Sequence, residues 1–316
     1  MHKNSYRATC MSAFQTIIPI FAIIVLGVLA RQRGFISEPF LAPANRLVYY
    51  LAIPAMIFRA ISGSALSSEF NATVVIATLA CLPLGFVLSL GMNLIIGNTG
   101  GRKGTFIQCA VHGNLGYIGL AVAFYYLGDK GFVHASIIAG LIMIVQNLLA
   151  VLALQSFAEP ERSGNRLKAI VRRIMINPVI ISALLGIGYA ALGLSMPVIL
   201  DRSLKILSGL ALPMALLLIG ASLSFTLVKT QIWSALASSL IKLLVLPALG
   251  LGFYRYLGFS TDIYMPALIL LAAPTATLTY VFAKEMRGDA DLAVATISVG
   301  TILSGLTYAG WLHWAG

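Results

Sequence analysis

The sequence predicts an all-α membrane protein whose ten transmembrane helices form two inverted repeats of five. Composition is the first reason: 59% of the 316 residues are hydrophobic and 10% are charged, with a mean hydropathy of +0.94. Soluble domains have about 45–50% apolar and about 25% charged residues, so this inventory cannot cover a water-facing surface. The second reason is the length of the apolar segments, and the third is an internal repeat.

Ten apolar segments are long enough to cross the hydrocarbon core as helices, for which about 20 residues suffice. Each run is continuously apolar, without the alternation of a β-barrel strand, so helices are preferred. In chain order the predicted spans cover residues 12–30, 41–61, 72–96, 105–127, 133–157, 174–192, 204–225, 232–257, 264–283 and 292–313.

An internal repeat relates the first two predicted spans to the sixth and seventh. The stretch 17–64 returns as 176–223, shifted by 159 residues without a gap. Each half contains five spans, an odd number, so the second half enters from the opposite membrane face and the repeats are inverted. The identical positions include Ile17/Ile176, Pro19/Pro178, Leu26/Leu185, Gly27/Gly186, Gly34/Gly193, Leu51/Leu210, Ala52/Ala211 and Pro54/Pro213.

The basic residues predict the orientation. Thirteen lie toward one side of the membrane, seven lie toward the side of the termini, and Lys242 lies deep within a span. The excess marks the cytoplasmic face, so both termini are predicted to be outside. The chain divides into a first repeat (1–158, with spans in 12–62 and 72–157), a polar cytoplasmic linker (159–173) and a second repeat (174–316, with spans in 174–225 and 232–313).

Past residue 223 the repeat changes register, because Pro83 in the third span aligns with Pro247 in the eighth at an offset of 164. This offset places the fourth and ninth spans in equivalent positions, with Asn114 opposite Leu278. Both spans are poor helix material. The fourth contains HGNLGYIG at 112–119, and the ninth contains APTATLTY at 273–280.

Interrupted segments at matching positions of two halves indicate a transporter site at the bilayer midplane. Half-helix N-termini present free N–H groups and a positive dipole end, which suit an anion. Tight helix packing by small residues is the alternative interpretation of either span alone. The predicted helix-breaking residues are Gly113, Gly116 and Pro274, and the predicted substrate-binding residues are His112, Asn114, Gly116, Tyr117, Lys242, Pro274, Thr275, Thr277, Thr279 and Tyr280.

The ionisable residues indicate whether a coupling ion is transported together with the substrate. Lys242 lies deep in the eighth span, which predicts that it attracts the anion or braces a broken helix. All ten acids lie in loops or near span ends, so proton or sodium coupling through a carboxylate is not expected. A sodium site built from backbone carbonyls stays open. Three roles stay open for His112: it carries a proton, it donates a hydrogen bond to the substrate, or it packs as a neutral ring.

Enzyme chemistry is not expected, because the sequence has no complete P-loop, no GxSG and no HExxH motif. The cysteines, Cys10, Cys81 and Cys109, lack metal-type spacing. We expect no cofactor and no metal, and the positive charge of +11 is interpreted as membrane topology rather than nucleic-acid binding.

The chain resembles the auxin efflux carrier family, which includes plant auxin exporters of the PIN type and bacterial permeases. The likeness covers nearly the whole chain. It is carried by residues 19–27, 54–59 (PAMIFR), 114–119 (NLGYIG), 177–178, 213 with 218–223 (LIGASL), 242 with 247, and 273–284.

The resemblance implies a fold like that of sodium/proton antiporters and bile-acid transporters. The first two spans of each half would form a scaffold that dimerises, and the last three a moving transport domain with two crossing broken helices. Substrates would be organic anions, contacted by Asn114. PIN-like members carry a second asparagine where this chain has Leu278 among threonines, which weighs against auxin itself.

The predicted function is therefore secondary transport of a small organic anion, a carboxylate that is auxin-like or a dicarboxylate, by elevator-type alternating access in a bacterial inner membrane. The alternatives are a sodium- or proton-coupled organic-anion symporter of the bile-acid type and a non-transporting membrane sensor.

Overall fold

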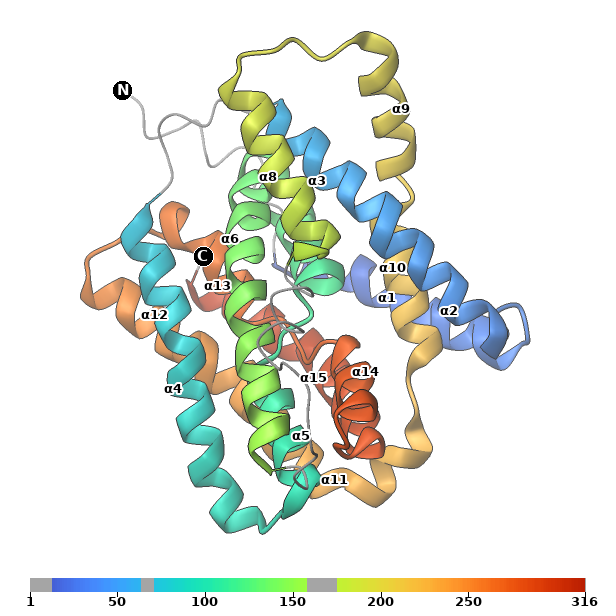
Figure 1. Cartoon of the computed structure of the whole chain (residues 1–316), viewed down its shortest axis with the longest axis vertical. Helices are drawn as coiled ribbons and strands as arrows, with labels where there is room; N and C mark the ends of the chain where they lie inside the picture. Colours follow the sequence, from blue (N-terminus) through green and yellow to red (C-terminus); the bar gives the residue numbers. More distant parts are fainter. Residues whose placement is uncertain (1–12, 64–70, 158–174, 316) are drawn as a thin grey trace.

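A computed structural model describes residues 13–63, 71–157 and 175–315, and in these parts the chain is helical apart from short connections (Figure 1). The predicted linker 159–173 and Cys10 lie outside the described residues. The first half contains α1 (Ala13–Gln32), α2 (Glu38–Leu47), η1 (Val48–Ala52), α3 (Ile53–Ser62), α4 (Ala72–Ile96), α5 (Gly100–Val111), η2 (Leu115–Gly119) and α6 (Leu120–Phe157).

The second half is helical in the same way, with shorter pieces. It contains α8 (Pro178–Ala191), α9 (Val198–Ser208), α10 (Ala211–Ser222), α11 (Phe225–Leu240), η3 (Ile241–Val245), α12 (Leu246–Tyr256), α13 (Thr261–Leu271), α14 (Leu278–Glu285) and α15 (Ala290–Ala315).

Seven continuous helical stretches among the described residues are long and apolar enough to cross a membrane. Predicted spans four and five share one of them, Leu115–Phe157, which is broken at Gly128 by a φ of 68°. Predicted span six is the shorter α8, and span nine is split into α13 and α14. The protein is thus an all-helical, multi-pass membrane protein, as predicted, while the count of ten crossings stays a prediction.

One group of helices packs through glycines. A Cβ on Gly27 of α1 would collide with the carbonyl oxygen of Leu217 in α10, and a Cβ on Gly220 of α10 would collide with that of Ile24. On α8, a Cβ on Gly186 would lie 2.9 Å from Cβ of Ile61 in α3. The backbones of these helix pairs therefore approach each other closely, as small residues in membrane helices allow.

An ion pair ties the same group together: Arg59 of α3 donates to Asp201 of α9 at 2.8 Å. Figure 1 shows α3, α8 and α9 in the upper part of the molecule with α10 below them on the right, while α5 and α11 lie at the lower end, which α4 reaches along the left side. In this second group α5 and α13 pack on α6, and α15 packs on α11.

Two of the wide, π-type turns each precede a proline. The turn η1 leads into Pro54, and η3 leads into Pro247. Proline has no N–H and crowds the preceding turn, so one extra residue per turn relieves the clash without ending the helix. The turn η3 matters for the site, because it holds Lys242.

Candidate functional site

Two membrane helices are interrupted in the segments that contain Gly113 and Pro274, whereas Gly116, also predicted to break a helix, lies within η2. The helix α5 ends at Val111, and the chain turns helical again at Leu115. The helix α13 ends at Leu271, and α14 begins at Leu278. Of the connecting residues, 112–114 and 272–276 are all buried. Each interruption frees backbone groups that lipid cannot satisfy, so protein must satisfy them.

The two interruptions satisfy each other. Gly113 and Thr275 form an antiparallel β-bridge. The N–H of Asn114 donates to the carbonyl of Pro274 at 2.7 Å, and the N–H of Ala276 donates to the carbonyl of His112 at 2.9 Å. This bridge joins residues 162 positions apart in the chain and brings four helix ends to one buried point. It is the centre of the candidate site.

Side chains from neighbouring helices secure the bridge. Gln146 of α6 brackets Gly113, accepting from its N–H at 3.0 Å and donating to its carbonyl at 3.3 Å. The hydroxyl of Thr275 donates to the carbonyl of Cys109, near the end of α5, at 2.9 Å. Thr275, predicted to bind substrate, thus has its hydroxyl committed to a helix end.

Lys242 lies against the bridge. Its side chain is 1% exposed, and Nζ donates to the carbonyl of Leu271, the last residue of α13, at 2.6 Å. A Cβ on Gly113 would lie 2.9 Å from Cε and 3.2 Å from Nζ of Lys242. The absence of a side chain at Gly113 is therefore what leaves room for the ammonium group. Of the two predicted roles, bracing of a broken helix is the one with a direct contact.

Asn114 stands at the start of the second half-helix. Its Oδ1 caps η2 by accepting from the N–H of Tyr117 at 3.3 Å, while its Nδ2 is buried and has no hydrogen-bond partner among the described residues. An unpaired buried donor is costly, so an anionic group that accepts from it is favoured.

Tyr117 reaches the other group of helices. Its hydroxyl donates to Oδ1 of Asn45 in α2 at 3.1 Å. Asn45 in turn donates to the carbonyl of Leu41. Sequence reasoning missed Asn45, although an amide near the start of an otherwise apolar span is a signal that could have found it.

Further buried polar groups, on or near the helices that meet at the bridge, have no hydrogen-bond partner in the part of the chain that the structure describes. Ser239 lies close to the bridge. A Cβ added to Gly300 would be 3.4 Å from the Oγ of Ser239 and 3.6 Å from the backbone nitrogen of Thr275. The unpaired atoms include both amide atoms of Gln108, Nδ1 of His112, Oγ of Ser239 and Oγ1 of Thr301. The region therefore has hydrogen-bonding capacity beyond what its own contacts use.

The remaining predicted site residues take different roles. The ring of His112 packs edge-on against Phe282, with centroids 5.6 Å apart. Thr279 returns its hydroxyl to the carbonyl of Ala276 at 2.7 Å. Gly116 and Pro274 are buried, and Thr277 is half-buried at the start of α14 without a side-chain cap. Tyr280 is exposed and faces Lys284 at 5.9 Å, and none of its described contacts joins it to the bridge.

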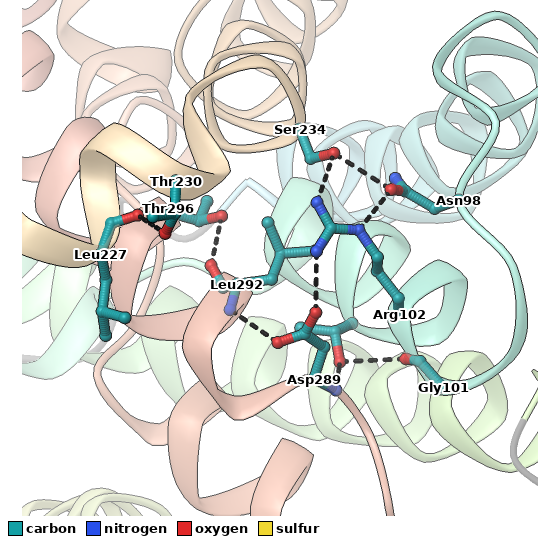
Figure 2. A network of polar contacts seen from close by, with 10 residues as sticks. Asn98, Gly101, Arg102, Leu227, Thr230, Ser234, Asp289, Leu292 and Thr296 are labelled. Atoms are coloured by element: carbon teal, nitrogen blue, oxygen red, sulfur yellow. Dashed lines mark hydrogen bonds and ion pairs between the residues drawn. The ribbon is translucent and has the colours of Figure 1, made fainter.

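A second polar cluster is centred on Arg102, near the start of α5 (Figure 2). Arg102 of α5 donates to Asp289 at 2.9 Å, to Asn98 at 2.7 Å and to Ser234 of α11 at 3.2 Å. The N–H of Asp289 donates to Thr105 at 2.8 Å. The cluster ties the start of α5 to α11 and to the turn before α15, and sequence reasoning did not find it.

A buried bridge between two interrupted helices, inside a multi-pass helical protein, is typical of a membrane transport protein. The family model described as "Membrane transport protein" matches residues 12–312. The chain belongs to this family of transporters, the auxin efflux carriers, and so is not an enzyme. The predicted resemblance is confirmed.

Relatives of known name support this assignment. The chain is 27% identical over 314 residues, 94% of each chain, to a protein of Rhizobium meliloti (strain 1021) named "Putative malonate transporter". It is 26% identical to an "Uncharacterized transporter" of Methanothermobacter thermautotrophicus, covering 95% of this chain and 98% of that one. It is 24% identical to "Auxin efflux carrier component 8" of Arabidopsis thaliana, covering 42% of this chain and 38% of that one.

Proposed function

We propose that the protein is a secondary transporter that carries a small organic dicarboxylate, of the size of malonate, between the two faces of a bacterial inner membrane. One observation carries this proposal: the bridge gathers the buried, unpaired Nδ2 of Asn114, the ammonium group of Lys242 and the starts of two half-helices. All of these favour negative charge. The name of the Rhizobium relative supports a dicarboxylate.

Paired contacts support two inverted repeats. The offset of 159 residues relates Gly27 to Gly186 and Phe58 to Leu217. Gly27 packs on the backbone of Leu217, and correspondingly a Cβ on Gly186 would lie 3.3 Å from the carbonyl oxygen of Phe58. The two backbone hydrogen bonds of the bridge are also counterparts, at an offset of 162 residues. The donor Asn114 corresponds to the donor Ala276, and the acceptor His112 corresponds to the acceptor Pro274. This offset pairs Asn114 with Ala276, two residues from the partner that the proline alignment at 164 predicts.

The packing favours an elevator mechanism. Spans 12–62 and 174–225 form the glycine-packed scaffold, and spans 72–157 and 232–313 carry the bridge and move as a transport domain. The scaffold supplies the surface for a homodimer, and both termini lie outside. A reporter that is active only in the cytoplasm, fused after residue 316, is expected to stay inactive, and strong activity would reverse the orientation.

Uptake of labelled malonate into liposomes containing the purified protein tests the proposal. An inside-positive potential is expected to drive uptake, because the cargo carries the charge. Uptake driven by a sodium or proton gradient and not by potential would favour the cation-coupled alternative. Binding without flux, seen as a shift in melting temperature alone, would identify a sensor. A thermal-shift comparison of mono- and dicarboxylates would rank the substrates.

A further inference from the structure

Two carbonyl groups near the ends of the interrupted helices are equivalent and yet are capped differently. The carbonyls of Cys109 in α5 and of Leu271 in α13 are separated by 162 residues, the same offset that relates the two sides of the bridge. Cys109 receives the neutral hydroxyl of Thr275, and Leu271 receives the charged ammonium of Lys242.

The difference begins at Gly113. Position 113 is the counterpart of Thr275, and it has no side chain to reach Leu271. Lys242 enters from η3 instead, with its Cε and Nζ within 3.2 Å of the place where a Cβ of Gly113 would be. A threonine at the equivalent position shows that a hydroxyl is sufficient to cap such a carbonyl. What Lys242 adds to the cap is therefore its positive charge.

That charge has no permanent counter-ion in the described parts of the chain. The three described salt bridges join Arg31 with Glu38, Arg59 with Asp201, and Arg102 with Asp289, and none includes Lys242. A helix C-terminus offers only a partial negative charge, about half of an elementary charge. Burial disfavours an unpaired ammonium, so an anion that binds beside Lys242 stabilises its charged form.

In cation-coupled transporters, C-terminal ends of half-helices and unwound carbonyls hold the sodium ion or proton that accompanies the substrate. Here a carbonyl of that kind already holds an ammonium group that is part of the chain. We propose that Lys242 is a built-in cation: it takes the place of a transported co-ion, so that the anion crosses without one. This inference rests on the proposed function.

The wild-type protein gives the first test. Malonate uptake into liposomes is expected to be the same with sodium and with choline outside, and the charge moved per malonate should equal the charge of malonate itself. Uptake that needs sodium or a proton gradient would overturn the inference. A wild type that moves no mono- or dicarboxylate would instead overturn the proposed function.

A double variant separates charge from capping. In Gly113→Ser/Lys242→Ala a serine hydroxyl replaces the ammonium at Leu271, copying the neutral arrangement at Cys109. Its melting temperature is expected to stay near that of the wild type, while uptake falls about tenfold or more, because the anion loses a charged partner. Wild-type uptake by this folded variant would show that the cap alone matters, and would overturn the inference.

The single variant Lys242→Ala asks whether an added cation can take the vacated place. Its uptake is expected to be low in choline and to rise when sodium or methylammonium is added. The matched control is Lys229→Ala on the exposed surface of α11, which should transport as the wild type does under every condition. A folded Lys242→Ala protein that gains nothing from either cation would contradict the assignment.

Discussion

Substitution of Gly220 by alanine tests the glycine packing of the scaffold. A Cβ there would collide with the carbonyl oxygen of Ile24, lie 2.8 Å from that carbonyl carbon and lie 3.1 Å from the Cα of Gly27. All three neighbours are backbone atoms, so a side-chain rotation cannot relieve the contact, and α1 and α10 must separate.

The magnitude follows from two opposing effects. Alanine favours the helix by about 1 kcal/mol over glycine. Overpacking a tight contact costs about 1–3 kcal/mol, and a backbone collision belongs at the upper end. Gly220→Ala should therefore lower the free energy of unfolding by about 2 kcal/mol, or the melting temperature by about 4 °C in a chain of this size.

Two matched variants make this prediction quantitative. Gly188 of α8 has open space at its Cβ position, so Gly188→Ala should raise stability by about 1 kcal/mol. Gly186→Ala should fall between the other two, because it meets the branched side chain of Ile61 at 2.9 Å. Melting curves of the detergent-purified proteins measure the order. Equal melting temperatures for Gly220→Ala and Gly188→Ala would refute the reasoning.

Three further predictions concern the site and the cluster around it. Asn114→Ala should abolish malonate uptake while lowering stability by only about 1 kcal/mol, the usual cost of a lost helix cap; near-normal uptake in liposomes would remove Asn114 from the site. Tyr117→Phe deletes the hydrogen bond to Asn45, worth about 1 kcal/mol, so substrate counterflow should change by up to about fivefold, and an unchanged rate would mean that this bond does not limit movement. A double-mutant cycle with Arg102→Ala and Asp289→Ala should give a coupling energy of about 1 kcal/mol in thermal melts, since both side chains are partly exposed. A coupling energy near zero would contradict a stabilising ion pair between α5 and the turn before α15.

The spans and the interruptions could be predicted because they depend on local chemistry. Continuous apolar runs predict the helices, and the helices are interrupted within the HGNLGYIG and APTATLTY segments, although Gly116 of the first segment lies within η2. The side-chain assignments were less predictable. The hydroxyls of Thr275 and Thr279 looked available for substrate, yet both donate to backbone carbonyls near the interruptions. A polar residue in a membrane helix can bind a ligand or its own backbone, and composition does not distinguish the two.

Contacts between segments far apart in the chain could not be predicted from the sequence. The offset of 164 followed from one proline pair, whereas the bridge uses 162, because the lengths between Pro83 and Gly113 and between Pro247 and Thr275 differ by two residues. Tyr117 with Asn45, and Arg102 with Asp289, join residues 72 and 187 positions apart. Such pairs depend on how whole helices pack, which no local pattern encodes.

The shared bridge has a consequence for the synthesis and membrane insertion of the protein. The interruption at residues 112–114 leaves the ribosome about 160 residues before Pro274, whose carbonyl it needs. In lipid its free backbone groups must be satisfied throughout that interval. Gln146 is only 33 residues downstream of Gly113, in the same half, and can bind both polar groups of that residue first. We therefore expect Gln146→Leu to impair membrane insertion of the first half even when the second half is intact.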